Sequence, residues 1–252
     1  MKPKFLKLEV TNRCNGACVF CPHDGHGEDM GLDMFKKIVD SFEGEEVQPQ
    51  FFGEPTLHPD FPEMLRYLKA KGKKVTFYTN GSFPLGNVDD VIKADPDRVI
   101  FSIESDNAEL CRKIRGLDFE NIYNNILKFP VSKIRIRMTE CVENENRIEE
   151  IEDFWKSHGI KTIVVNETPI VRHEVKEFTD YVCKRPFEQL VIKSNGDIVL
   201  CCVDWYGEYK IGNIEDGIDK VWNSKKFNDL RKKINAKDEP SICKKCGFKV
   251  RG

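Results

Sequence analysis

Residues 5–21 read FLKLEVTNRCNGACVFC. Residues 5–11 alternate apolar and polar side chains, which is the pattern of a β-strand with one face in the core. Three cysteines follow directly, Cys14, Cys18 and Cys21, in a C-x3-C-x2-C spacing. Because three thiolates on one short loop can converge on one metal centre, this stretch predicts a metal site at the end of the first strand.

Strand-like and helix-like stretches alternate along the first two thirds of the chain. The strands are expected at 5–11, 49–52, 74–79, 98–103, 133–139 and 161–165. The helices are expected at 32–42, 61–71, 109–114, 120–129 and 147–158, where apolar residues recur at helical spacing. Such alternation is typical of a parallel sheet, and six strands are fewer than the eight of a closed barrel. The sequence therefore predicts the α/β class, with a partial (β/α)6 TIM-like barrel over residues 1–168.

The pattern changes after Pro169. Residues 190–193 and 197–200 flank Ser194-Asn195-Gly196, a favourable hairpin turn, and residues 225–234 have helical periodicity. The segment 169–252 is too short for a large core of its own, and small units of this kind usually need a metal. We therefore expect a small C-terminal metal-binding extension made of a β-hairpin and a helix.

The bulk composition excludes several classes of protein. The 252 residues include 40 Lys and Arg against 42 Asp and Glu, which gives a formal charge of −2. A protein with this charge balance has no overall positive electrostatic field of the kind that attracts nucleic acid. No apolar run is long enough to span a membrane. The first ten residues lack the apolar segment of a signal peptide. We expect a cytoplasmic protein, in which ten cysteines indicate metal binding rather than disulfides.

The three N-terminal cysteines allow two kinds of metal site. Structural zinc takes four ligands, so a zinc knuckle would need His23 or His26 as the fourth. A 4Fe–4S cluster held by three cysteines instead keeps one iron open for a cofactor. The spacing, its place after the first strand and Phe20 before the last cysteine resemble the signature of the radical S-adenosylmethionine (SAM) superfamily. In that family, reductive cleavage of iron-bound SAM gives a 5′-deoxyadenosyl radical that abstracts hydrogen from a substrate.

Further motifs at the ends of the expected strands carry the same resemblance. FFGEP at 51–55 is similar to the GGEP motif of the family, TNG at 79–81 to its TNG motif, and SIES at 102–105 to its SIDG motif. The resemblance implies that these stretches bind the methionine and ribose parts of SAM at the carboxyl ends of the strands, where α/β sheets place ligands. The implied SAM-binding residues are Phe20, Gly53, Glu54, Thr79, Asn80, Ser102, Glu104, Arg137 and Val142.

A second set of cysteines lies in the C-terminal segment. It consists of Cys183, Cys201, Cys243 and Cys246, with Gly196 five residues before Cys201. Four thiolates suit zinc, but the layout resembles the SPASM and twitch extensions of radical SAM enzymes, which begin with C-x(9–15)-G-x4-C and bind auxiliary 4Fe–4S clusters. The stretches IGNI at 211–214 and VWNSKKF at 221–227 match the linker of those domains. No cysteine follows Cys246, so the resemblance implies one auxiliary cluster, the twitch arrangement.

Three cysteines remain outside both sets. The G-x4-C spacing selects Cys201 as the ligand, so its neighbour Cys202 is interpreted as a small buried hydrophobe that points the other way. Cys111 and Cys141 are interpreted as core residues.

The layout is most similar to twitch enzymes of the 2-deoxy-scyllo-inosamine dehydrogenase type. That resemblance implies oxidation of a small alcohol or sugar-like substrate, with the auxiliary cluster accepting an electron and a flavodoxin or ferredoxin as reductant. The candidate substrate contacts are Phe52, Tyr78, Arg172 and Asp204. Peptide modification is the alternative, which we expect less because no N-terminal domain is present to hold a leader peptide. A non-catalytic iron–sulfur or zinc protein is the alternative from another class.

Overall fold

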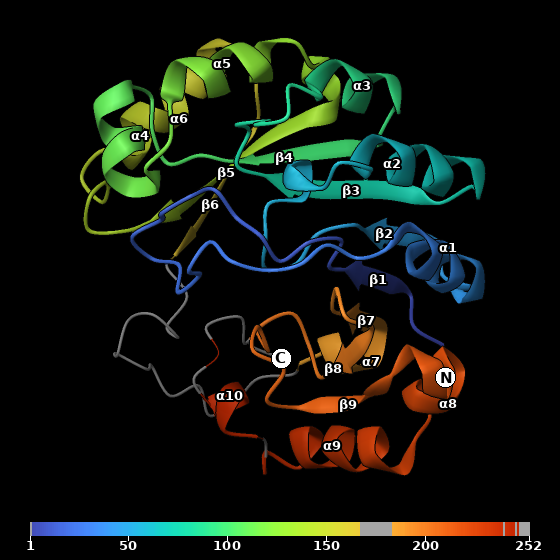
Figure 1. Cartoon of the computed structure of the whole chain (residues 1–252). Helices are drawn as coiled ribbons and strands as arrows, with labels where there is room; N and C mark the ends of the chain where they lie inside the picture. The colour runs from blue at the N-terminus through green and yellow to red at the C-terminus, as the bar shows by residue number, and fades with distance from the viewer. Residues whose placement is uncertain (1, 167–182, 239, 245, 247–252) are drawn as a thin grey trace.

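The computed structural model describes residues 2–166, 183–238, 240–244 and 246, arranged around one nine-stranded sheet (Figure 1). The strand order is β6-β5-β4-β3-β2-β1-β7-β8-β9. The first six strands pair in parallel, which confirms the expected partial barrel. They are β1 (Phe5–Leu8), β2 (Glu46–Gln48), β3 (Lys74–Thr79), β4 (Arg98–Ser102), β5 (Ile134–Glu140) and β6 (Thr162–Asn166).

Helices connect these strands and lie along one side of the sheet in Figure 1. They are α1 (Leu32–Ser41), α2 (Phe61–Ala70), α3 (Val88–Lys93), α4 (Ala108–Arg115), α5 (Phe119–Leu127) and α6 (Ile148–Ser157), with short 3-10 turns at Pro55–Leu57 and Val131–Lys133. The helix α3 was not expected from the sequence. Among the described residues, no helix has the length and apolar character needed to cross a membrane.

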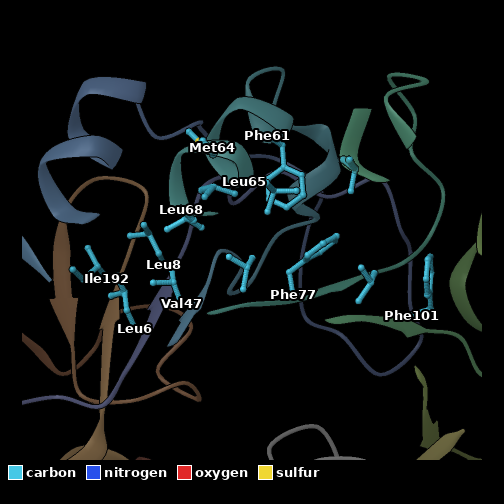
Figure 2. Close-up of a cluster of buried hydrophobic side chains, with 14 of the residues drawn as sticks. Leu6, Leu8, Val47, Phe61, Met64, Leu65, Leu68, Phe77, Phe101 and Ile192 are labelled. Atoms are coloured by element: carbon cyan, nitrogen blue, oxygen red, sulfur yellow. The ribbon is translucent and has the colours of Figure 1, made fainter. Parts of the chain in front are cut away.

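Alternation along the strands divides their side chains between the core and the opposite face. In β1, Leu6 and Leu8 are fully buried, whereas Lys7 points to the other face of the sheet, away from the helices. The core-facing side chains pack under the apolar face of α2, as Figure 2 shows for Phe61, Met64, Leu65 and Leu68 above Leu6, Leu8, Val47 and Phe77. The face away from the helices is therefore left for the functional site.

The second strand lies earlier than expected. The sequence predicted it at 49–52, but β2 covers Glu46–Gln48, and residues 51–53 form a bend. Proline has no backbone N–H to donate to a neighbouring strand, so Pro49 ends the pairing on β2. The FFGEP stretch is thus a loop after the strand rather than the end of the strand.

The C-terminal extension continues the barrel sheet. Its elements are α7 (Arg185–Glu188), β7 (Gln189–Ile192), β8 (Asp197–Val199), β9 (Lys210–Asn213), a 3-10 turn (Ile214–Asp216), α8 (Ile218–Trp222), α9 (Lys225–Asn235) and α10 (Ser241–Lys244). The expected hairpin is confirmed as β7 and β8, and Gly196 in its turn has φ of +82°. Strand β7 also pairs in parallel with β1, from Phe5 opposite Gln189 to Leu8 opposite Ile192. The expected boundary at 168/169 lies outside the described residues.

One buried arginine holds the extension together. The Arg231 guanidinium on α9 donates to the carbonyl oxygens of Pro186 at 2.8 Å and Trp222 at 2.7 Å. It also stacks on the rings of Trp222 and Phe227, with its central carbon 4.1 and 3.7 Å from their centroids. Because all of these groups are buried, the W-x4-F-x3-R pattern in this segment is explained by packing.

Candidate active site

A cavity of about 500 Å³ lies at the carboxyl ends of the barrel strands. It brings together twelve of the residues singled out from the sequence. These are Cys14, Phe20, Cys18, Cys21, Phe52, Gly53, Glu54, Tyr78, Thr79, Asn80, Ser102 and Arg137. Its volume falls in the range of small-molecule sites in proteins.

The loop that carries the three N-terminal cysteines is held in place by hydrogen bonds to α4 and by a salt bridge to Asp29. On one side, Ala17 and Val19 donate backbone hydrogen bonds to the carbonyl oxygens of Arg115 and Ile114, at 2.8 and 2.9 Å. On the other side, the Arg13 guanidinium binds both carboxylate oxygens of Asp29, at 3.0 and 2.6 Å. The position of the thiols is therefore set by the end of α4 and by the returning chain near residue 29.

The three thiols fit a shared iron–sulfur cluster. All three line the cavity, and a Cβ on Gly16 would stand 3.8 Å from the sulfur of Cys14 and 3.5 Å from that of Cys18. Burial raises the pKa of Cys14 to about 11, and it also raises the pKa of Cys18 and Cys21. Three buried thiolates are unfavourable alone, and iron binding would supply the positive charge that stabilises them.

The alternative zinc ligand His23 is already occupied. Its Nε2 lies 2.5 Å from the carbonyl oxygen of Asn12, and its Nδ1 accepts from the backbone N–H of Gly25 at 2.7 Å. Among the described residues, no three Cys, His, Asp or Glu side chains stand at the spacing of a single bound ion. A four-iron cluster is a larger body than one ion, so its thiolates are spread more widely.

The carboxylate of Glu54 ties the FFGEP loop to the TNG motif. Its Oε1 accepts from the hydroxyls of Thr56 and Thr79, both at 2.7 Å, and from the Thr56 N–H at 3.1 Å. Its Oε2 accepts from the Asn80 N–H at 2.6 Å. Burial raises the pKa of Glu54, although these hydrogen bonds favour its charged form. Two of the strand ends that surround the cavity are thus locked together.

The same motifs also position the cysteine loop. The Asn80 side-chain amide donates to the side-chain oxygen of Asn15 at 2.9 Å, next to Cys14. A Cβ on Gly53 would stand 2.5 Å from the carbonyl oxygen of Thr11 and 2.6 Å from that of Arg13. No side chain larger than hydrogen fits between the FFGEP loop and the backbone of residues 11–13, so glycine is required at position 53.

A buried ion pair that the sequence did not predict lies beside the thiols. Arg115, the last residue of α4, binds both carboxylate oxygens of Glu104, and both side chains are almost fully buried. Arg115 also donates to the Cys18 sulfur at 3.4 Å. The central carbon of its guanidinium lies 5.6 Å from the centroid of the Phe20 ring. Glu104 accepts from the Thr139 N–H at 3.1 Å and is not among the cavity-lining residues. Its carboxylate therefore holds Arg115 rather than facing the cavity.

Three thiols of the second cysteine set, those of Cys201, Cys243 and Cys246, lie close enough to interact. Burial raises the pKa of Cys201 well above its usual value, and the neighbouring thiols Cys202, Cys243 and Cys246 raise it further. Cys183 is partly buried against the same core. Cys201 follows β8 and Cys243 lies on α10, so the structure brings Cys201, Cys243 and Cys246 near one another.

Cys202 differs from the expectation of a buried hydrophobe. It is only partly buried and lines the cavity, where its nearest charged neighbours include Lys7. Successive residues at a strand end point to opposite sides, so Cys201 faces the extension and Cys202 faces the cavity. The side chain of Cys202 therefore points away from that of Cys201, as expected, but it points toward the cavity and not into the core. Cys111 and Cys141 are buried core residues, as expected.

Three further candidates lie elsewhere. Val142 is 67% exposed and does not line the cavity. Asp204 is fully buried outside the lining, where it accepts from the Tyr209 N–H at 3.0 Å and closes the loop after Cys201. Arg172 lies outside the described residues. Sequence reasoning also missed Lys7, Gln50, Arg115, Thr139, Arg185 and Trp205, which line the cavity.

Two family models cover most of the chain. The model of the radical SAM superfamily matches residues 8–155. The chain belongs to the radical SAM superfamily. The model of the SPASM iron–sulfur cluster-binding domain matches residues 183–247, which include the second cysteine set. SAM and the 4Fe–4S cluster of this superfamily are therefore its cofactors, and Cys14, Cys18 and Cys21 lie within the matched region.

Curated radical SAM relatives have diverse activities. The chain is 28% identical over 194 residues to the tungsten-containing aldehyde ferredoxin oxidoreductase cofactor-modifying protein of Pyrococcus furiosus, covering 69% of this chain and 54% of that relative. It is 26% identical over 223 residues to a probable GTP 3′,8-cyclase of Methanocaldococcus jannaschii, covering 75% and 74%. The chain thus spans about half the length of the first of these relatives.

Solved structures share the fold. BtrN in complex with AdoMet and 2-DOIA aligns with a TM-score of 0.66 and 18% identity, over 98% of this chain and 94% of that one. SuiB of Streptococcus suis bound to the precursor peptide SuiA aligns with a TM-score of 0.73 and 18% identity, over 98% and 70%. Both likenesses concern the barrel and the extension together.

Proposed function

We propose that this radical SAM protein oxidises an alcohol of a small, sugar-like molecule, with an auxiliary 4Fe–4S cluster held by Cys183, Cys201, Cys243 and Cys246. One observation carries the proposal. The cavity is lined by all three N-terminal cysteines and also by Cys202, which directly follows a cysteine of the second set. A substrate in this cavity would therefore lie between the two cysteine sets.

Bound SAM and the N-terminal cluster supply a 5′-deoxyadenosyl radical after one electron from a flavodoxin or ferredoxin, and the auxiliary cluster offers an acceptor for one electron. The substrate alcohol would lose a hydrogen atom to the deoxyadenosyl carbon, a proton, and one electron, and would become a ketone. One electron thus enters and one leaves in each turnover.

The residues of the chain orient the reactants. Glu54, Thr79 and Asn80 fix the loop on which the methionine part of SAM would rest, and Arg137 is available for its carboxylate. Phe52 and Tyr78 supply apolar walls for the substrate. Both rings would cover part of a bound substrate and so limit the access of water to it.

The experiment uses anaerobically reconstituted protein with a chemical or flavodoxin reductant. We expect 5′-deoxyadenosine together with a ketone when the protein is given a panel of polyols and amino polyols. A Cys243→Ala, Cys246→Ala double variant should still form 5′-deoxyadenosine but no ketone, since the substrate radical then lacks its electron acceptor.

Cys111→Ala, in the core and outside both cysteine sets, is the matched control and should retain both products. Circular dichroism must show that the double variant is folded. Ketone formation at the wild-type rate by the folded double variant would refute the acceptor role. Deoxyadenosine formation only with peptides would replace the alcohol by a peptide substrate.

A further inference from the structure

An alcohol that becomes a ketone releases a proton, and few groups on the described cavity wall can accept it. Glu54 is the one carboxylate among the described lining residues, and its two oxygens already accept four hydrogen bonds from the protein. The three N-terminal cysteines are the expected cluster ligands, and the lining arginines stay protonated. Lining amides, hydroxyls and the neutral phenol of Tyr78 are not bases near neutral pH. Lys7 and Cys202 therefore remain as candidates.

Lys7 projects from the middle of the sheet into the cavity. It is half-buried on β1, opposite Gln48 of β2 on one side and Val191 of β7 on the other. Its Nζ lies 5.6 Å from the centroid of the Tyr78 ring on β3. Among the residues that the structure describes, Lys7 has no hydrogen-bond or ion-pair partner. Its amino group can therefore contact a molecule in the cavity.

The surroundings of Lys7 favour its neutral form. Burial lowers the pKa of Lys7, and the positive charges of Arg185 and Arg137 lower it further, whereas the Cys202 thiol opposes these effects. A lowered pKa means that more of the side chain is a neutral amine at a given pH. The neutral amine has a lone pair on Nζ, which is what proton acceptance requires.

The carboxylates near this part of the sheet have other partners. They are carried by α7, by β2 and by the residue that follows β1. Glu9 accepts from Ser194 at 3.2 Å, Glu46 from Gln48 at 3.2 Å and Glu188 from Lys4 at 2.8 Å. Strand β7 has no charged residue. These elements therefore supply no counter-ion that would hold Lys7 as an ammonium ion.

The same wall of the cavity also calls for a hydrogen-bond donor. Gln50 is 5% exposed and lines the cavity, and its side-chain oxygen has no partner among the described residues. It lies two residues after Gln48, which is the neighbour of Lys7 on β2. A buried acceptor without a donor is unfavourable, and a ligand hydroxyl would satisfy it. This wall therefore suits a molecule with more than one hydroxyl.

We propose that Nζ of Lys7 is the base that accepts the hydroxyl proton of the substrate alcohol. This assignment deepens the proposed function and rests on it for the reaction. The carbon-bound hydrogen atom goes to the 5′-deoxyadenosyl carbon, the hydroxyl proton goes to the Lys7 amine, and one electron goes to the auxiliary cluster as the C–O bond becomes C=O. The ammonium ion then gives its proton to water, which restores the neutral amine.

Competitive labelling tests the acid–base behaviour of Lys7 without turnover. Reconstituted protein with SAM present is treated with limiting acetic anhydride over a series of pH values, and acetylation of Lys7 is measured by mass spectrometry. We expect half-maximal labelling at a pH below about 10.4, the pKa of a free lysine side chain. Half-maximal labelling at or above that pH would overturn the inference.

Lys7→Met and Lys7→Arg test the role in turnover, with an alcohol deuterated at the reacting carbon. Both variants should still transfer deuterium to 5′-deoxyadenosine, because hydrogen abstraction does not need the base. Ketone formation should fall by roughly 100- to 10,000-fold. Lys7→Arg keeps a positive charge, so its loss of ketone separates proton acceptance from attraction of charge. Lys74→Met, at the exposed start of β3, is the matched control and should retain both products.

The pH dependence distinguishes Lys7 from Cys202. In the wild type, ketone formation should rise with pH until Lys7 is neutral, and the residual activity of Lys7→Met should lack this rise. A rise that persists in Lys7→Met but is lost in Cys202→Ala would overturn the inference and assign the base to Cys202. Ketone formation at the wild-type rate by folded Lys7→Arg would also overturn it. Failure of the wild type to form any ketone, with Lys7 labelled as a neutral amine, would instead count against the proposed function.

Discussion

The indole ring of Trp205 lies parallel to the phenyl ring of Phe52, with 5.5 Å between centroids and an interplanar angle of 7°. Phe52 follows β2 in the barrel, and Trp205 follows β8 in the extension. Phe52 also contacts Tyr206 edge-on at 5.9 Å and His23 at 4.7 Å. This aromatic group therefore closes the cavity wall between the two cysteine-bearing parts of the chain.

The stacking of these rings should be measurable as a coupling energy. In a double-mutant cycle of Phe52→Ala and Trp205→Ala, we expect an interaction free energy of ~0.5–1.5 kcal/mol, because aromatic pairs stabilise beyond their buried area. Denaturant unfolding of the four proteins gives this value. Tyr206→Phe, which keeps its ring, should change stability little. Strict additivity of the two single substitutions would contradict the contact.

Glu54→Gln should weaken SAM binding by roughly ten- to a hundredfold. Glu54 is the expected partner of the methionine amino group of SAM, so the loss of its charge would remove a charge-assisted hydrogen bond of ~1.5–3 kcal/mol to the ligand. Calorimetric titration of the reconstituted protein with SAM tests this. Glu63→Gln, at the exposed side of α2, is the control. An unchanged dissociation constant would remove Glu54 from the binding site.

Arg115→Gln should make the N-terminal cluster harder to reduce. The guanidinium donates to Cys18 and brings a positive charge close to the thiolates, and both effects stabilise the added electron. Loss of a charged hydrogen bond worth up to ~3 kcal/mol corresponds to a fall of up to ~130 mV in reduction potential. Redox titration followed by electron paramagnetic resonance measures this fall.

The unpaired Glu104 would also destabilise the Arg115→Gln variant, so the double variant Arg115→Gln, Glu104→Gln is needed. It should recover thermal stability while retaining the low potential. A potential equal to that of the wild type in the double variant would assign Arg115 a purely structural role.

The neighbours Cys201 and Cys202 should differ sharply in their effect on iron content. Cys201→Ala should lose about half of the iron, because Cys201 is buried with Cys243 and Cys246 nearby. Cys202→Ala should retain all of it, because Cys202 faces the cavity. Iron and sulfide analysis of folded protein distinguishes the two. Loss of iron in Cys202→Ala would exchange the ligand assignment.

The apo protein should lose stability in alkaline solution. The pKa of Cys14 is raised by burial from 9.0 to about 11 in the folded chain. A raised pKa favours the neutral thiol, so its contribution to stability is complete below pH ~9 and is lost as the pH rises toward ~11. Thermal melting between these values should show a decline that is smaller in Cys14→Ala. Iron-loaded protein, whose thiols are already deprotonated, is the control.

The sequence predicted the parts of the site that are continuous motifs. Cys14 and Glu54 lie on the loops after β1 and β2, and Thr79 is the last residue of β3. All three line the cavity because strand ends meet at one edge of a parallel sheet. The alternation in residues 5–11 did not reveal which face bordered the cavity, so Lys7 was missed. Arg115 was missed because its partners, Glu104 and Cys18, lie far from it in the sequence.

The limits of the pattern are also visible in the fold. Residues 49–52 were expected to form a strand, but Pro49 has no N–H to donate, and the pairing lies at Glu46–Gln48 instead. The parallel pairing of β7 with β1 could not be read from a hairpin pattern, since the two strands are separated by most of the chain. Non-local backbone pairing of this kind has no short sequence signal.

The pairing of β1 with β7 has a consequence for how the molecule can move. Backbone hydrogen bonds connect the strands of the sheet from β6 to β9 through β1. The barrel strands and the strands of the extension are therefore not separated by a hinge within the sheet. The distance between the two sets of thiols is therefore set by the spacing of the strands. Removing the extension would also uncover the edge of β1 and leave it open to pairing with other chains. We therefore expect the electron path across the cavity to have a fixed length, and the N-terminal barrel to aggregate when produced alone.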